Sequence, residues 1–304
     1  MQAHARDAGS GEPRVLAPLG RRLLTVTENE SLGAYRVLKA ADPDGPEPAA
    51  GQFAMLATAE RWGAGEDERP YLPRAFSYAR FRDGEAHFLL EDVGPGTRRL
   101  CELREGEELW LLGPLGSGFT EPKEGRRPLL VGGGVGIAPL AIWQDHLLAG
   151  KPDAKNESSS EHAPQKSVRL DVERAHTTPL LGFRDGAHAV GAALLAHPRL
   201  ASDDGSIGHH GLVTDLLRQE LNHDENATVY ACGPPPMLEA VRALCAERGV
   251  PAQLALEAGM ACGFGACYGC VVPAREGYLR VCVDGPVIDA ADLEHVGVHA
   301  GSAT

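Results

Sequence analysis

The chain has 304 residues, of which 43% are hydrophobic and 23% charged, and its formal net charge is −13 at pH 7. This composition is typical of a globular protein with room for two or three modules, and the acidic charge argues against nucleic acid as a partner. The sequence contains no apolar run of about eighteen residues, so we expect no transmembrane helix and no membrane partner. Residues 1–13 lack the apolar core of a signal peptide, which predicts a cytoplasmic protein.

The first part of the chain, residues 14–125, has the pattern of a small antiparallel β-barrel. Short apolar runs alternate with Gly- and Pro-containing turns, and their even spacing favours a barrel over an open sheet. The predicted strands are Arg22–Thr27, Tyr35–Lys39, Phe53–Ala57, Ala86–Glu91 and Glu108–Leu112.

The periodicity changes in residues 126–252, where strand-like and helix-like segments alternate. Such alternation predicts a parallel sheet with helices on its faces, that is, an α/β domain. Residues 149–173 are polar and lack periodicity, so we expect a flexible insertion there. The predicted strands are Arg127–Val131, Leu180–Arg184 and Thr228–Cys232, and the predicted helices are Ala138–Leu148, Ala187–Ala196, Thr214–Asn222 and Pro236–Arg248.

Four of the seven cysteines lie in a Gly-rich stretch with the spacing C-x4-C-x2-C-x11-C: Cys262, Cys267, Cys270 and Cys282. A plant-type [2Fe–2S] centre uses a C-x4-C-x2-C run with a distant fourth cysteine. Intervening glycines let backbone amides approach the cluster sulfurs. The alternative is a zinc ribbon, but zinc sites usually pair one C-x2-C with another or with histidines. We therefore predict a small cluster module over residues 253–290 that depends on its metal for order. Cys245 has helical spacing with apolar residues and is predicted to be a core thiol.

A candidate flavin site combines two short motifs of the predicted barrel. Arg74, Ala75, Phe76 and Ser77 open a strand, and Gly96-Thr97 follows about twenty residues later. An arginine can pair with a pyrophosphate, an aromatic ring can cover a flavin face, and Gly96 and Thr97 can donate amide and hydroxyl hydrogen bonds to phosphate oxygens. Without the other motifs of the chain, two ordinary β-turns and a surface arginine would be the favoured interpretation.

Two further motifs suggest a nucleotide site in the α/β domain. Gly132–Gly136 follows a strand and opens a helix, which places amide donors, including those of Gly133, Gly134 and Gly136, against a phosphate. This motif is a relative of the dinucleotide fingerprint rather than a match, and an ordinary glycine-rich turn explains it equally well. Cys232-Gly233 ends a later strand, at the sheet edge where ligands of open α/β sheets bind. Residues 203–206 are a turn by their composition.

The order of these motifs is more specific than any one of them. The chain resembles the ferredoxin–NADP reductase superfamily, because four motifs follow one another in the order found there: Arg-x-Phe-Ser, Gly-Thr, Gly-Gly-Gly-Val-Gly-Ile-Ala-Pro-Leu and Cys-Gly-Pro-x-Pro-Met. Residues 257–272 and 280–287 resemble, more closely, the electron-transfer subunits of NAD-dependent dihydroorotate dehydrogenase, as do residues 114–119 and 204–208. The likeness extends from about residue 23 to residue 290, apart from the insertion.

This resemblance implies a flavin-binding barrel, a nucleotide-binding α/β domain and a C-terminal [2Fe–2S] module. It implies that FAD binds near Arg74, Ala75, Phe76 and Ser77, near Leu89, Leu90 and Glu91, and at Gly96 and Thr97. The family often has Pro where Ala75 stands; alanine at this position makes the turn less rigid but still allows the backbone contacts.

The resemblance also implies a pathway. Dihydroorotate is oxidised on the FMN of a separate catalytic subunit, and electrons pass through the cluster and FAD to NAD in pyrimidine (UMP) biosynthesis. The implied assembly is a heterotetramer with two copies of each subunit, and this chain needs no catalytic residue for dihydroorotate. A diaphorase or transhydrogenase subunit of similar build is an alternative, and a [2Fe–2S] redox sensor is an alternative of another class.

Overall fold

The computed structural model describes residues 20–62, 72–149 and 177–296. Most of the predicted insertion therefore lies outside the described residues. Within these ranges no helix is long and apolar enough to cross a membrane.

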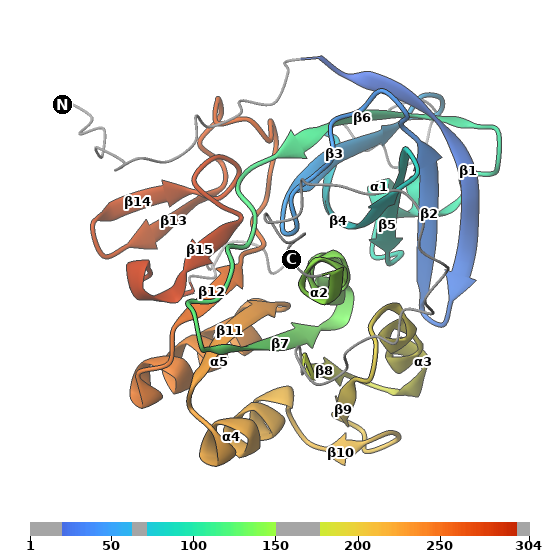
Figure 1. Cartoon of the computed structure of the whole chain (residues 1–304). Coiled ribbons are helices and arrows are strands. Elements are labelled where there is room, and N and C mark those ends of the chain that lie inside the picture. Colours follow the sequence, from blue (N-terminus) through green and yellow to red (C-terminus); the bar gives the residue numbers. More distant parts are fainter. Residues whose placement is uncertain (1–19, 63–71, 150–176, 297–304) are drawn as a thin grey trace, which may run out of the picture.

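The N-terminal part is a closed six-stranded barrel with strand order β1-β2-β5-β4-β3-β6, and each neighbouring pair is antiparallel (Figure 1). In the closed barrel each strand has a neighbour on both sides, at least along part of its length. Side chains alternate between buried and accessible positions along β6, as the barrel pattern requires. The strands are β1 (Arg22–Leu32), β2 (Tyr35–Ala41), β3 (Phe53–Thr58), β4 (Arg74–Arg82), β5 (Glu85–Leu90) and β6 (Glu108–Leu115).

A short helix, α1 (Pro95–Cys101), follows β5 where the sequence suggested only a turn. It is seven residues long, too short for a helical repeat of apolar residues to show in the sequence. Its first turn begins with Pro95, whose missing amide costs nothing at that position. The ordinary β-turn that sequence analysis left open as an alternative for this segment is therefore not found, and Gly96 and Thr97 lie in the first turn of α1.

The second part is a sheet with strand order β10-β9-β8-β7-β11-β12-β15. All strands are parallel except β15, which pairs antiparallel with β12. The order reverses at the boundary between β7 and β11, which makes that boundary the switch point of the sheet. The strands are β7 (Arg127–Gly133), β8 (Pro179–Phe183), β9 (Arg199–Ser202), β10 (His209–His210), β11 (Ala227–Cys232), β12 (Ala252–Ala255) and β15 (Val287–Asp289).

Four helices accompany this sheet: α2 (Ala138–Ala149), α3 (Gly186–Ala189), α4 (Val213–His223) and α5 (Pro235–Arg248). Cys245 is buried on α5, as predicted. The helix predicted over residues 187–196 is instead α3 followed by a 3₁₀ helix, Val190–Leu194.

Helix α2 lies between the barrel and the sheet (Figure 1) and joins them through polar contacts as well as packing. Arg80 on β4 places its Nε 2.8 Å from an Asp145 carboxylate oxygen, and its Nη2 donates to the Leu194 carbonyl at 2.6 Å. The barrel therefore has a fixed orientation relative to the strand ends of the sheet.

The C-terminal segment packs against both parts. It contains the hairpin of β13 (Val271–Ala274) and β14 (Gly277–Arg280), and β15 then joins the sheet edge. The Ser117 amide at the end of the barrel donates to the Gly285 carbonyl at 2.6 Å. Gly116 has φ +74°, and an added Cβ would lie 2.6 Å from Pro286 Cδ, so only glycine suits this junction.

Candidate functional site

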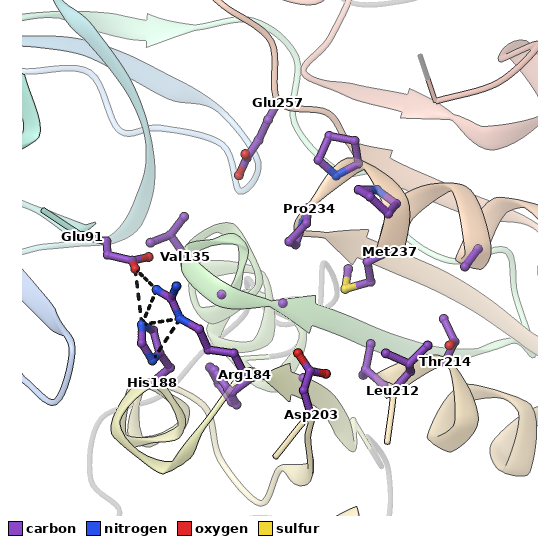
Figure 2. Close-up of a pocket in the computed structure, with 18 of the residues that line it drawn as sticks. Glu91, Val135, Arg184, His188, Asp203, Leu212, Thr214, Pro234, Met237 and Glu257 are labelled. Carbon is purple, nitrogen blue, oxygen red and sulfur yellow. Dashed lines mark hydrogen bonds and ion pairs between the residues drawn. The ribbon is translucent and has the colours of Figure 1, made fainter. Parts of the chain in front are cut away.

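A cleft of about 660 Å³ opens where the barrel faces the carboxyl ends of the parallel strands (Figure 2). Its walls come from the end of β5, from the loops after β7, β8 and β9, and from the turn between β11 and α5. This is the switch point of the sheet, where open α/β sheets bind ligands. The predicted residues Glu91, Gly133 and Gly134 line the cleft.

The glycine loop after β7 packs tightly against the turn after β11. A Cβ added at Gly133 would lie 2.7 Å from Met237 Sδ, and one at Gly136 would lie 2.6 Å from the Cys232 backbone. Gly136 and Cys232 are buried, and neither they nor Gly233 line the cleft. These three residues hold the two loops together, and the loops in turn shape the cleft.

A polar cluster spans the two parts of the molecule at one side of the cleft. Arg184, directly after β8, forms an ion pair with Glu91 at the end of the barrel strand β5 (Figure 2). Its Nε also lies 2.9 Å from His188 Nε2, and His188 Nδ1 lies 2.7 Å from an Asp185 carboxylate oxygen. The hydrogen bond from His188 holds the pKa of Asp185 below its ordinary value. Sequence analysis did not identify Arg184 or His188 as site residues, because they meet Glu91 only in the folded chain.

Two acidic residues face the cleft from other sides: one from the turn predicted at residues 203–206, and one that sequence analysis did not assign to a site. Asp203 follows β9, and Glu257 follows β12 and projects from the opposite wall (Figure 2). Glu257 is accessible from the cleft, yet protein atoms surround it, and this partial removal from water raises the pKa of its carboxyl group. Glu257 lies inside a segment that carried the family resemblance (residues 257–272), whereas Asp203 lies directly before another (residues 204–208).

The two flavin motifs of the barrel meet in space. The Arg74 guanidinium packs directly on Gly96: a Cβ added there would lie 2.7 Å from Nε and 2.9 Å from Cζ. Arg74 also donates to the Leu72 carbonyl, and its guanidinium lies 5.9 Å from the ring centroid of Trp62. Among the described residues the Arg74 guanidinium has no carboxylate partner, and it lies beside the first amides of α1, which have no acceptor within the helix. This combination suits a phosphate group.

Strand β4 has an open edge beside this arginine. The register pairs β4 with β5 only from Tyr78 to Arg82, whereas β3 pairs with β4 from Arg74 to Ser77. Among the described strands, the backbone of residues 74–77 therefore has a partner only on the side of β3. The Thr97 hydroxyl, by contrast, accepts from the Gly94 amide and donates to the Gly94 carbonyl, both at 3.0 Å. Leu89 and Leu90 are buried in the barrel, so their backbones rather than their side chains can contact a ligand.

The four predicted cysteines come together as two pairs. The Cys262 thiol interacts with Cys267, and the Cys282 thiol interacts with Cys270, whose Sγ also lies 3.4 Å from the Cys282 amide nitrogen. Burial opposes ionisation of Cys262, but backbone amides that include those of Phe264 and Cys267 outweigh it and hold its pKa at about 6. Burial and the neighbouring Cys270 raise the pKa of Cys282 to about 12.

This arrangement fits a two-iron cluster better than a single metal ion. Thiolates that accept backbone amide hydrogen bonds are typical of iron–sulfur sites, and four cysteines in two pairs can hold two irons. A zinc ion needs ligands that converge on one point. Across residues 20–62, 72–149 and 177–296, no three His, Cys, Asp or Glu side chains converge in that way.

Comparisons with known proteins agree with this geometry. The family of iron-sulfur cluster binding domains of dihydroorotate dehydrogenase B matches residues 257–294, and the oxidoreductase NAD-binding domain family matches residues 192–243. The dihydroorotate dehydrogenase B (NAD(+)) electron transfer subunit of Caldanaerobacter subterraneus subsp. tengcongensis is 36% identical over 253 residues, which are 82% of this chain and 88% of that protein. The chain belongs to the family of dihydroorotate dehydrogenase B electron transfer subunits. The corresponding subunit of Geobacillus thermodenitrificans is 34% identical over 254 residues, 80% of this chain and 86% of that protein.

Solved structures place the fold in the ferredoxin–NADP reductase group. An NADH-dependent reduced ferredoxin–NADP oxidoreductase aligns with a TM-score of 0.70 at 23% identity, over 91% of this chain and 92% of that one. A ferredoxin NADP+ reductase from Neisseria gonorrhoeae, solved with FAD and NADP, aligns with a TM-score of 0.55 at 15% identity, over 75% and 92% of the two chains. The predicted family, the barrel, the parallel sheet and the C-terminal iron–sulfur domain are therefore confirmed, and the zinc ribbon is not supported.

Proposed function

We propose that this chain is the electron-transfer subunit of an NAD-dependent dihydroorotate dehydrogenase in pyrimidine biosynthesis. The observation that carries this proposal is the paired set of four cysteines within a domain of that family, in the same chain as a nucleotide-type cleft. When bound, the cluster carries single electrons, FAD exchanges single electrons for a hydride, and NAD accepts that hydride. This chain supplies the three binding sites and fixes their relative positions.

The flavin site is proposed along β4 and α1. The Arg74 guanidinium holds the FAD pyrophosphate, with the amides of Gly96 and Thr97 donating beside it. The open edge of β4, from Ala75 to Ser77, offers backbone groups to the flavin ring, and Phe76 offers an aromatic surface. The backbones of Leu89 and Leu90 and the Glu91 side chain complete the proposed set. The Thr97 hydroxyl is engaged within its own turn, so its amide is the donor we assign.

The NAD site is proposed in the 660 Å³ cleft. Gly133 ends β7 and Gly134 begins the helical segment that follows, and both line the cleft, so we assign their amides to a phosphate of the nucleotide. Asp203 offers a carboxylate to ribose hydroxyls from the end of β9. The loops held by Gly136, Cys232 and Gly233 keep the cleft open toward the barrel, so that nicotinamide and flavin can meet.

The partner is proposed to be an FMN-containing catalytic subunit, in a complex with two copies of each chain. Three aromatic side chains near the cysteines are exposed: Phe264, Tyr268 and Tyr278 have relative exposures of 46%, 64% and 75%. Exposed aromatic residues are frequent at protein interfaces. An acidic chain without a described membrane-crossing helix is consistent with a protein partner in the cytoplasm.

The domain limits proposed are residues 14–125 for the flavin barrel, 126–252 for the NAD domain and 253–290 for the cluster module, with an insertion at 149–173. The limit at residue 253 separates the two proposed binding functions, but the two modules share one sheet. β12 begins at Ala252, and β15 of the cluster module completes the same sheet.

The test is reconstitution from separately purified subunits. Alone, this chain should oxidise NADH with an artificial electron acceptor but should not oxidise dihydroorotate. Mixed with a dihydroorotate dehydrogenase catalytic subunit, it should form a stable complex that reduces NAD with dihydroorotate. Failure to associate, or coupling to hydrogen or NADPH with another partner, would instead support the diaphorase or transhydrogenase alternative. Absence of NADH-dependent acceptor reduction in flavin-loaded protein would favour a redox sensor.

A further inference from the structure

Arg280 lies against the outside of the loop that carries three of the cysteines. It ends β14, two residues before Cys282. A Cβ added at Gly265 would lie 3.3 Å from Arg280 Nη1, so the guanidinium rests on the backbone of that glycine. Its Cζ also lies 5.5 Å from the ring centroid of Tyr268, within the range of a cation–π interaction. The positive charge is therefore held over residues 265–268.

The same loop faces the sulfur atoms on its inner side. The Gly265 amide donates to the Cys282 thiol, and the amides of Phe264 and Ala266 donate to the Cys262 thiol. The Gly265 backbone therefore contacts the guanidinium and, through its amide, the Cys282 sulfur. Because the guanidinium is partly withdrawn from water, its charge acts more strongly on the sulfur ligands than a charge in bulk solvent would.

The position of Arg280 is fixed by two neighbours. Asp284 accepts a hydrogen bond from the Arg280 amide at 2.9 Å, and one of its carboxylate oxygens lies 3.6 Å from Arg280 Nε. Tyr268 adopts φ +59°, a conformation that is uncommon for a residue with a side chain.

We propose that Arg280 is a positioning residue that sets the redox balance of the cluster by favouring its reduced form. Each electron that the cluster accepts from the catalytic partner adds one negative charge to a group that is already anionic. A fixed guanidinium beside it stabilises the added charge, whereas the Asp284 carboxylate opposes that effect. Two such single-electron steps would supply the two electrons that, together with one proton from water, make up the hydride that NAD accepts. This inference rests on the proposed function, because it requires the cluster.

The experiment is a redox titration of the full-length, cluster-loaded chain, followed by electron paramagnetic resonance. Arg280→Gln should make one-electron reduction of the cluster at least about tenfold less favourable, a fall of about 59 mV in midpoint potential. Arg280→Lys keeps the charge and should stay within about threefold of the wild type. Asp284→Asn removes the opposing charge and should shift the potential upward. Arg275→Gln is the matched control, because Arg275 is exposed at the far turn of the hairpin and should leave the potential unchanged.

The opposite signs expected for Arg280→Gln and Asp284→Asn separate an electrostatic role from structural damage. The difference between wild type and Arg280→Gln should also shrink at high salt, because Arg280 is 33% exposed. Equal potentials in all variants, or a fall in Arg280→Lys as large as in Arg280→Gln, would overturn the inference. Iron and acid-labile sulfide are measured in the same samples. Their absence from the wild type would reject the proposed function itself, whereas intact clusters with unchanged potentials would reject only the role of Arg280.

Discussion

Substitution of Gly96 by alanine tests the flavin site without disturbing the fold. Gly96 lies in helix α1, where alanine is preferred over glycine by up to about 1 kcal/mol, so the free energy of unfolding should hold or rise slightly. The new Cβ, however, would lie 2.7 Å from Arg74 Nε and must displace the guanidinium. A hydrogen bond to a charged group contributes about 1.5–3 kcal/mol, so FAD affinity should fall about tenfold to over a hundredfold.

The assay is a fluorescence titration of the apoprotein with FAD, combined with thermal unfolding of each variant. Arg74→Ala should cause a loss of similar size, and the double variant should be no worse than Arg74→Ala alone, because both changes remove one interaction. Additive losses would show that Gly96 and Arg74 act independently. Unchanged affinity in Gly96→Ala would refute the assignment of Arg74 to the pyrophosphate.

Three further outcomes follow from the junctions and charges described above. Gly116→Ala places a side chain at φ +74° against Pro286, so chemical denaturation should show a free energy of unfolding about 1–3 kcal/mol lower than that of the wild type. Gly125→Ala is the control, because Gly125 also has a positive φ (+82°) but faces open space, and it should lower the free energy of unfolding by less. The folded chain binds the Glu257 proton more tightly than the unfolded chain does, because the pKa of Glu257 is raised in the folded state. The wild type should therefore lose stability relative to Glu257→Gln as pH rises from about 4.5 through the raised pKa. A constant difference in melting temperature between the two proteins from about pH 4 to pH 8 would contradict this. Removal of iron by a chelator should increase amide hydrogen exchange in residues 262–282 while leaving the barrel protected, and equal exchange in both states would show that the segment holds its order without metal.

The barrel and the three central strands of the second sheet (β8, β7 and β11) could be predicted because their strands are long enough to show a pattern. Strands such as Glu108–Leu115 have clean alternation, and the structure extends the predicted runs or shifts them by one residue. The elements that were missed are short. β9 has four residues and β10 has two, so neither can display periodicity, and both are defined by pairing with β8 or with each other.

The candidate site divides along the same line. The cysteine spacing is dictated by the dimensions of an inorganic cluster, so it is visible in the sequence and the structure brings the four thiols together. Arg74 and Gly96 were expected to serve one ligand, and their direct contact supports that expectation. The cluster of Glu91, Arg184 and His188 is different, because loops that are about ninety residues apart in the chain converge only through tertiary packing.

The proposed electron route is tested by assaying two activities of a Cys270→Ser variant that retains FAD, with Cys245→Ser as a buried-thiol control. In complex with a catalytic subunit, Cys270→Ser should lose dihydroorotate-dependent NADH formation, because electrons from the partner can no longer enter through the cluster. It should keep NADH-dependent reduction of ferricyanide, because nicotinamide meets the flavin directly, and Cys245→Ser should keep both activities. Dihydroorotate-dependent NADH formation at the wild-type rate, in protein shown to lack the cluster, would contradict the proposed route.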